Sequence, residues 1–394
     1  MHIIDINNNN NYNIKIKKVL VMKIKIKQNK LLENLNYAIR GVSNKNLIPI
    51  LSCIKFELKE EGLYLLSTNN EFAKKTFIPK KDIVEIIELG EIVISGRYIY
   101  DIVKKLNNEI ITIEEIIDSQ VLITTNNSSF KLNCNKANEF PNIDLEFTKN
   151  PILLEKSIFK TMINQIIFST SSQESRPILT GINFKVHKNI LECTATDSYR
   201  LSKKTIELKE NIENDINIVI PSKNLIETSK MLIDDNDKLQ MHIFANKIIF
   251  KCNDIIILSR LINGNYPATD KLIPEDFSLT VKVKLSDFYN AIDRASLLTN
   301  EEEKNIINLF IDSNKAKITS NIPEIGNVEE NINIINNENK NLNISFSSKF
   351  MMEAIKVFNS EEIELCFNGE IKPIIIKNIN NSKLIQLILP IRTF

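Results

Sequence analysis

Apolar residues recur along this chain with two periods, one typical of strands and one typical of helices. Segments 54–58 (IKFEL) and 182–186 (INFKV) alternate apolar and polar residues, as half-buried strands do. Over 29–42 the apolar residues instead stand three or four positions apart, which predicts an amphipathic helix. Similar spacing predicts helices over 156–169 and 286–298. Together the two patterns predict an α+β protein with many strands.

One stretch of the chain occurs three times at equal spacing. Each copy begins 126 residues after the one before it, which is too long for a solenoid unit of about 20–50 residues. We therefore expect three related domains, each built as strand, helix, strands, then strand, helix, strands. The copies are IVISGRYIYDIVKKL (92–106), IVIPSKNLIETSKML (218–232) and ISFSSKFMMEAIKVF (344–358).

Proline-marked turns give the expected limits of these domains. FPNID (140–144) and YPATD (266–270) are also 126 residues apart, so linkers are expected near 145–151 and 271–279. An asparagine-rich segment over 331–343 is predicted to be a surface loop. We call the three expected domains the first repeat (22–147), the second repeat (148–273) and the third repeat (274–394).

Residues 1–21 do not fit the repeat. They include an asparagine run over 7–11, and their apolar stretch at 19–22 is too short for the core of a signal peptide. Met22, followed by an alternating Lys-Ile segment, is the better start of the fold. Residues 1–21 are therefore predicted to be a disordered or mis-annotated extension.

Composition limits the function without identifying it. The 394 residues are 43% hydrophobic and 25% charged, as in ordinary globular proteins, and no apolar run is long enough to span a membrane. Net charge is +1, so any binding of nucleic acid depends on how the charge is distributed. The five cysteines lie far apart and form no C-x-x-C motif, which favours buried thiols in a reducing cytosol.

The repeated segment carries the same charge pattern in every copy. A cation in the first helical turn opposes the helix dipole, and a cation placed before its acid is the weaker orientation for a pair four residues apart. A solvated helix face explains one copy; three copies suggest a positive surface suited to a polyanion. The members are Arg97, Lys223 and Lys349, then the acids Asp101, Glu227 and Glu353, then Lys104, Lys230 and Lys356.

Residues that favour a helix start precede each of these cations. Ser95 with Gly96 and Ser347 with Ser348 are predicted capping residues. Pro221 is predicted to be the proline of a first helical turn.

Sequence signals for catalysis are missing. None of the eight glycines forms a phosphate-binding loop motif, and the three histidines are too scattered for a metal site or a catalytic triad. His187 and His242 are instead expected on strands.

Several short motifs resemble one known family. They are TDSYRL (196–201), GNYP (264–267), IPIL (48–51) and LILPIR (387–392), and the likeness extends from Met22 to the C-terminus. The chain resembles the bacterial DNA polymerase III beta subunit, the sliding clamp. This resemblance implies three clamp domains per chain and two chains joined head to tail in a ring, with helices lining the hole and sheets outside.

The resemblance also implies a function. A clamp encircles duplex DNA without reading its sequence and tethers the replicative polymerase, which raises the effective concentration of polymerase at the primer. Clamp loader and repair proteins are the other expected partners. No enzymatic activity, cofactor or metal is expected, and the expected location is the cytoplasm.

Three sets of site residues follow. Lys45, Arg97, Gln173 and Lys223 match DNA-facing positions of the family, and Lys349 is added from the repeat alone. Leu297 and Leu298 match an apolar knob of the dimer interface, and Phe130 with Leu132 matches its socket. A hydrophobic cleft for partner peptides between the second and third domains is matched by Arg176, Leu179, Thr196, Ser198, Tyr199, Arg200, Leu201, Pro267, Lys271, Leu272, Ile371, Pro373, Leu387, Ile388, Leu389, Pro390, Ile391 and Arg392.

Two details depart from the family. Ser198 stands where glycine is frequent in the family, and we expect its side chain to narrow the floor of the cleft. The C-terminal tail runs one residue past the usual end of the family. Two other functions remain open at this point: a triplicated interaction scaffold without DNA, and an enzyme on a repeated fold. A scaffold predicts a monomer or a dimer that forms no ring, and an enzyme predicts a pocket with clustered titratable groups.

Overall fold

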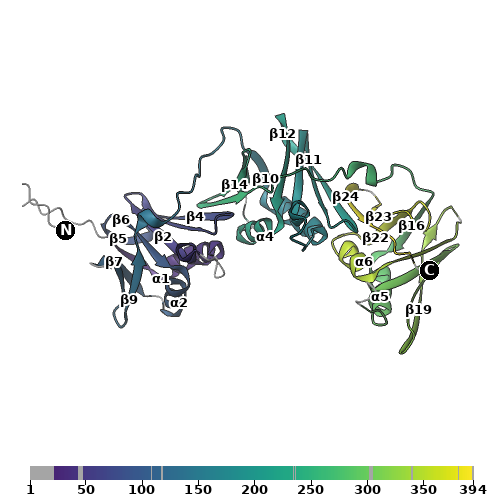
Figure 1. Ribbon diagram of the computed structural model, residues 1–394, viewed down its shortest axis with the longest axis horizontal. Coiled ribbons are helices and arrows are strands. Elements are labelled where there is room, and N and C mark those ends of the chain that lie inside the picture. Colours follow the sequence, from purple (N-terminus) through teal and green to yellow (C-terminus); the bar gives the residue numbers. More distant parts are fainter. Residues whose placement is uncertain are drawn as a thin grey trace, which may run out of the picture. The chain divides into compact units, whose positions relative to one another are not determined.

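The computed structural model describes residues 22–42, 48–107, 109–116, 119–233, 235, 237–300, 305–338, 340–379 and 381–392. The chain forms two compact units (Figure 1). One contains Met1–Leu145 with Asp254–Ile257, and the other contains Glu146–Asn253 with Leu258–Phe394. The predicted extension over 1–21 and the predicted DNA-facing Lys45 lie outside the described residues.

The first unit has the predicted order of strand, helix, strands, strand, helix, strands. Its strands hydrogen-bond in the order β4-β3-β2-β6-β9-β8-β7-β1-β5. The helices are α1 (Gln28–Ala38) and α2 (Gly96–Lys105), and the strands are β1 (Lys23–Lys27), β2 (Cys53–Lys59), β3 (Gly62–Thr68), β4 (Phe72–Pro79), β5 (Ile83–Glu88), β6 (Gly90–Ser95), β7 (Ile110–Ile116), β8 (Gln120–Thr124) and β9 (Ser129–Asn135).

The second repeat has the same order with longer strands. It consists of β10 (Ile152–Glu155), α3 (Lys156–Ile166), β11 (Gly181–Thr196), β12 (Arg200–Pro221), α4 (Ser222–Met231), β13 (Lys238–Ile243), β14 (Lys247–Cys252) and β15 (Ile255–Arg260).

The third repeat returns to shorter strands. It consists of β16 (Leu279–Lys284), α5 (Leu285–Ser296), β17 (Ile306–Asp312), β18 (Lys315–Ile322), β19 (Gly326–Asn333), β20 (Ile335–Asn336), β21 (Leu342–Ser347), α6 (Ser348–Ile355), β22 (Glu362–Phe367), β23 (Ile374–Asn378) and β24 (Asn381–Ile388).

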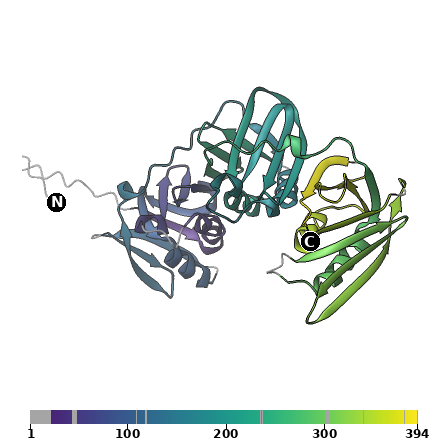
Figure 2. The same cartoon turned by 45° about the vertical axis from the view of Figure 1, so that its right-hand side comes forward.

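One sheet joins the second and third repeats inside the second unit. Its strand order is β11-β12-β24-β23-β22-β16-β20, so the sheet passes from one repeat to the next between β12 and β24 (Figure 2). The two strands are antiparallel, from Arg200 opposite Ile388 to Lys204 opposite Leu384. This ladder holds the two repeats together by backbone hydrogen bonds.

Each repeat packs its two helices against one another and against its sheets: α1 with α2, α3 with α4, and α5 with α6. The buried faces are the predicted apolar ones, for example Leu31 and Leu35 in α1 and Phe288 and Ile292 in α5. Burial of such side chains contributes about 1.5–3 kcal/mol each. The helix predicted over 29–42 ends earlier, at Ala38, and continues as a 3₁₀ turn over Ile39–Gly41.

The predicted caps are wrong for two of the three repeated helices. Ser347 does cap α6, because its hydroxyl accepts a hydrogen bond from the Phe350 N–H at 3.5 Å. Ser95 precedes α2 without such a bond, and Pro221 stands at the N-cap of α4, not in its first turn. All three residues end a paired strand, Ser95 opposite Cys53, Pro221 opposite Gly181 and Ser347 opposite Ile306, so strand pairing does not distinguish α6 from the other two helices.

The prediction of a surface loop over 331–343 is also wrong. The segment includes the end of β19, all of β20 and the start of β21. Asn336 is 3% exposed, its N–H donates to Asn314 and its side-chain amide donates to the Lys340 carbonyl. The N–H and the side-chain amide NH₂ of Asn336 are therefore paired, whereas its buried Oδ1 has no hydrogen-bond partner among the described residues.

Other expectations are confirmed. All five cysteines are buried and unpaired, and His187 and His242 lie on β11 and β13. Of the helices among the described residues, none is long and apolar enough to cross a membrane.

Candidate functional site

The TDSYRL motif forms a tight turn between β11 and β12. Asp197 Oδ1 accepts hydrogen bonds from the N–H groups of Tyr199 and Arg200, at 2.9 and 3.0 Å. The Thr196 hydroxyl donates to the Arg200 carbonyl at 2.6 Å and accepts from the Ser198 N–H at 3.2 Å. An Asp or Thr side chain that bonds to backbone two or three residues further on fixes such a turn. We call residues 196–201 the docking turn.

Ser198 occupies the left-handed region of the backbone, with φ of 80°. That conformation costs a residue with a Cβ about 1–2 kcal/mol, whereas glycine adopts it readily. The frequent glycine of the family at this position therefore has a conformational reason. The Ser198 side chain is exposed.

Replacing Ser198 with glycine is expected to stabilise the protein by about 0.5–1 kcal/mol, because relief of the backbone strain exceeds the entropy that glycine adds to the unfolded chain. Thermal and urea unfolding measure this effect. Ser198→Ala retains the Cβ and is the matched control. Equal stability of the glycine and alanine variants would contradict the strain.

The C-terminal segment runs beside the docking turn. After β24, the Leu389 N–H donates to the Tyr199 carbonyl at 2.9 Å, and the Ile391 N–H donates to the Ser345 carbonyl at 2.7 Å. Pro390 between them has no N–H, so these two bonds hold the segment. The LILPIR motif of the third repeat and the TDSYRL motif of the second thus lie together, although they are far apart in sequence.

Exposed apolar side chains surround this junction. Tyr199 is 58% exposed, Leu272 49%, Ile371 63% and Leu389 38%. Beneath them Leu201 and Leu387 are buried in one cluster with Cys366 and Ile375, and Ile273, next to Leu272, packs against it. The structure therefore brings residues of the predicted cleft to one junction between the repeats.

The remaining predicted cleft residues divide by exposure. Buried ones support the surface and are not available to touch a ligand directly: Leu179, Thr196, Arg200, Leu201, Leu387 and Ile388. Exposed or half-buried ones are Arg176, Ser198, Pro267, Lys271, Pro373, Pro390, Ile391 and Arg392.

Hydrogen bonds and two aromatic rings fix the position of the Arg200 side chain. Its Nε donates to Asp197 Oδ2 at 3.0 Å, its Nη2 donates to the Phe168 carbonyl at 2.5 Å, and its Nη1 binds the Glu353 carboxylate on α6. The guanidinium also lies over the rings of Phe350, at 4.3 Å, and Phe168, at 5.3 Å. Sequence analysis missed Asp197, Phe168 and Phe350 as supports of this site, although Asp197 lies within the quoted motif.

A buried polar chain continues the contact between the two repeats. The Ser202 hydroxyl bonds to the Gln386 side chain and, at 2.6 Å, to the Ser169 hydroxyl. Gln386 Nε2 donates to the Gln165 carbonyl at 2.9 Å. Because buried polar groups are costly to leave unpaired, this network favours a single arrangement of the second and third repeats.

The predicted DNA-facing residues that the structure describes lie on the helices and adjoining turns. Arg97 is in the first unit on α2, 76% exposed, with its Nε 3.9 Å from Asp101. In the second unit Lys223 on α4 is 86% exposed and lies 3.8 Å from Glu174, and Gln173 is exposed in the preceding loop. Lys349 lies in the first turn of α6 and lines a shallow hollow between α5 and α6 that is also lined by Lys356 and Ser296.

The predicted dimer residues occupy two separate surfaces. Leu297 follows α5 and is 78% exposed, the most exposed large apolar side chain described, and Leu298 beside it is half-buried. On β9, Phe130 and Leu132 are half-buried against the core of the first repeat. Along Ser129–Asn133 this strand pairs with β8 on one side.

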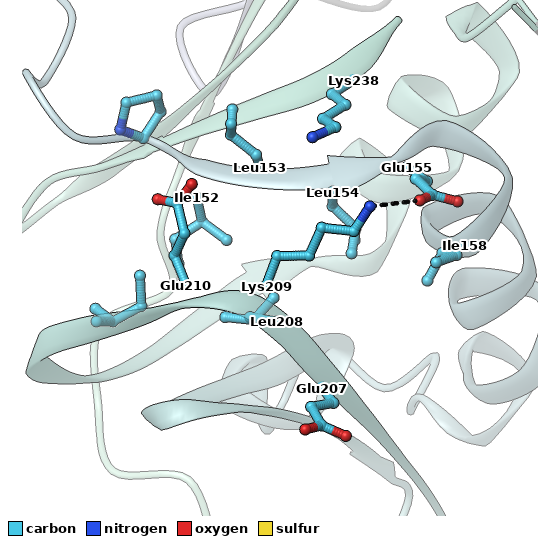
Figure 3. Close-up of a pocket in the computed structure, with 12 residues that line it drawn as sticks. Ile152, Leu153, Leu154, Glu155, Ile158, Glu207, Leu208, Lys209, Glu210 and Lys238 are labelled. Atoms are coloured by element: carbon cyan, nitrogen blue, oxygen red, sulfur yellow. Dashed lines mark hydrogen bonds and ion pairs between the residues drawn. The ribbon is translucent and has the colours of Figure 1, made fainter. Parts of the chain in front are cut away.

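A second hollow, between β10 and the middle of β12, contains none of the predicted site residues. Its floor is apolar, with Ile152 and Leu154, and Lys209 crosses it to Glu155 at 3.4 Å (Figure 3). In the first repeat the equivalent strands β1 and β5 are paired. The hollow therefore marks a local opening of the repeated sheet in the second repeat.

Burial shifts the pKa of several titratable groups among the described residues. Burial raises the pKa of the Cys134 and Cys366 thiols to about 11, and raises the pKa of Tyr266, so these groups stay protonated at neutral pH. Among the residues that the structure describes, no group of three His, Cys, Asp or Glu side chains could hold a metal ion.

Comparison with known families decides what the repeats are. Residues 22–144, 153–268 and 270–392 match, in order, the family profiles of the N-terminal, central and C-terminal domains of the DNA polymerase III beta subunit. The chain belongs to this family. The prediction of three tandem clamp domains in an α+β fold is confirmed.

Known clamps resemble the chain over almost its whole length. The beta sliding clamps of Staphylococcus epidermidis and Staphylococcus aureus are 37% and 36% identical to it over 372 residues, which are 93% of this chain and 98% of each relative. The crystal structure of the DNA polymerase sliding clamp from Bacillus subtilis has a TM-score of 0.91 at 37% identity and covers 95% of this chain and 100% of its own. The crystal structure of the DNA polymerase III beta chain from Streptococcus pneumoniae has a TM-score of 0.89 at 32% identity and covers 94% of this chain and 100% of its own.

Proposed function

We propose that this protein is a DNA sliding clamp, which encircles duplex DNA and tethers the replicative polymerase. Membership of the DNA polymerase III beta subunit family, with all three domains matched in order, is the observation that carries the proposal. A ring holds DNA by topology, so its own contacts can stay weak enough to slide. Tethering then keeps the polymerase at a high effective concentration near the primer.

The ring is formed by two chains, head to tail. Leu297 and Leu298 of one chain fit an apolar socket at Phe130 and Leu132 of the other. An exposed leucine beside a half-buried one suits an interface that is covered in the assembly. The domains run over 22–147, 148–273 and 274–394, and six of them surround the duplex.

Basic and polar residues of the three repeats face the DNA. Lys45, Arg97, Gln173, Lys223 and Lys349 supply phosphate contacts. The high exposure of Arg97 and Lys223 supports this role, because long exposed side chains can follow a moving backbone. Each contact alone is weak.

Partners dock at the junction of the second and third repeats. Exposed Tyr199, Leu272, Ile371 and Leu389 offer apolar contact, and Arg176, Lys271 and Arg392 surround it with positive charge. An apolar surface with polar edges suits a short linear motif of a polymerase, a clamp loader or a repair protein. The protein acts in the cytoplasm without catalysis or a cofactor, and its buried, unpaired cysteines fit a reducing compartment.

Retention on circular DNA tests this function. The cognate clamp loader and ATP are used to load the protein on a nicked circle, which is then cut once. Loss of the protein on cutting is expected, because a ring slides off a free end. Retention on linear DNA would show ordinary affinity binding, and failure to load, with the loader active on a control clamp, would favour the interaction scaffold.

Reversing Arg97 and Lys223 together to glutamate is expected to shorten residence on the circle at least about threefold, because two phosphate contacts are lost. Gel-filtration retention of labelled circles measures the effect. Lys209→Glu is the control for charge reversal: Lys209 is 73% exposed, lies on β12 and is not one of the proposed DNA-facing residues. Unchanged residence of the double variant on the circle would show that both side chains are surface charges without a role in holding DNA.

A further inference from the structure

The acids of the three repeated helices have different partners. Asp101 lies 3.9 Å from Arg97 of its own helix, and Glu227 lies 2.9 Å from Lys230 of its own helix. Glu353 instead leaves its helix and binds Arg200 of the neighbouring repeat. Of the three equivalent carboxylates, that of Glu353 therefore forms an ion pair between domains, whereas the other two pair within their own helices.

A lack of nearby cations in the sequence does not explain why Glu353 pairs with Arg200. Lys349 stands four residues before Glu353 and Lys356 three after it, both at spacings that allow pairs within a helix. Neither lysine forms an ion pair with a described residue. Because Arg200 holds the carboxylate, Glu353 does not compensate the charge of Lys349 in α6 or of Lys356 at its C-cap.

The geometry of the contact requires arginine. The guanidinium lies over the Phe350 ring of α6 at 4.3 Å and over the Phe168 ring at 5.3 Å. At the same time its N–H groups bind the carboxylates of Asp197 and Glu353. Only a planar cation with several N–H donors can stack and bind two carboxylates at once. With its side chain 10% exposed, Arg200 has little surface left for a docked peptide.

We propose that Arg200 is a positioning residue that connects the docking turn to α6, the helix that carries Lys349 and is followed directly by Lys356. The Arg200 backbone is part of the turn, its side chain binds α6, and α6 also packs against β24, which leads into the C-terminal segment (Figure 1). A peptide that presses on the turn therefore changes the environment of α6. The inference rests on the proposed function, since the turn and α6 belong to its two surfaces.

Hydrogen exchange on the full-length protein tests the connection. The probe is a synthetic peptide copied from the clamp-binding segment of the cognate polymerase. In wild-type protein, bound peptide is expected to change the exchange of α6 amides. In Glu353→Gln, α6 amides are expected to exchange about tenfold faster and to lose that response, while peptide affinity stays within about twofold.

Glu227→Gln is the matched control, since its carboxylate pairs within α4, and it should leave α6 unchanged. A Glu353→Gln protein whose α6 responds like wild type would overturn the inference. So would Arg200→Lys, if it weakened peptide binding without altering α6, because Arg200 would then contact the peptide directly. If wild-type protein failed to bind the peptide, the docking function would fall together with the inference; a bound peptide with an unchanged α6 would refute the inference alone.

Discussion

Replacing Leu297 and Leu298 together with glutamate is expected to convert the dimer into folded monomers. Leu297 is 78% exposed in the single chain, so a charge there costs the isolated fold little. At the proposed interface the same charge would face Phe130 and Leu132 without a partner, which is costly once water is excluded. Dimer affinity should fall at least about 100-fold, or about 2.7 kcal/mol.

Light scattering measures the outcome, since the proposed dimer would have twice the chain mass of 45.3 kDa. Ile325→Glu is the matched control: Ile325 is 71% exposed, lies between β18 and β19 and is not part of the proposed interface. Circular dichroism establishes that each variant is folded. An unchanged dimer mass for the double variant would place the interface elsewhere.

Deletion of Leu389–Phe394 is expected to weaken polymerase binding at least about 100-fold while leaving the dimer intact. The deletion removes the exposed Leu389 and the two hydrogen bonds that hold the segment to Tyr199 and Ser345. The ladder between β12 and β24 ends at Ile388, so the joint between the repeats keeps its backbone pairing.

Surface plasmon resonance with the cognate polymerase measures the affinity. Removal of residues 393–394 alone is the control, because it leaves Leu389 and Ile391 and their hydrogen bonds in place. Full affinity after the longer deletion would show that partners dock at another surface. A monomer after that deletion would instead mean that the segment supports the fold of the third repeat.

Local patterns predicted the elements well. The apolar spacing over 29–42 gave the position of α1 to within a few residues, and the alternation over 182–186 identified part of β11. Both signals come from the period with which a helix or a strand turns its side chains towards the core. Helix ends were predicted less well, because a 3₁₀ turn continues the same apolar face after Ala38.

Local rules gave two kinds of wrong prediction. All three repeated helices start directly from a paired strand, yet only Ser347 accepts a capping hydrogen bond, which the sequence pattern did not distinguish. Asparagine-rich sequence suggested a loop, yet Asn336 is buried, its N–H donates to Asn314 and its side-chain amide donates to the Lys340 carbonyl. At this position Asn314, a partner distant in sequence, provides an interaction that the local rule does not consider.

The sequence by itself determined the triplication, the helix and strand pattern and the family, because these depend on spacing and on short contiguous motifs. Only the tertiary structure decided the partner of Glu353. Arg200 and Glu353 are 153 residues apart, and they meet because the β12–β24 ladder aligns two repeats and because two aromatic rings receive the guanidinium. The charge pattern showed three equal acids, and their unequal roles follow from which of them the neighbouring repeat can reach.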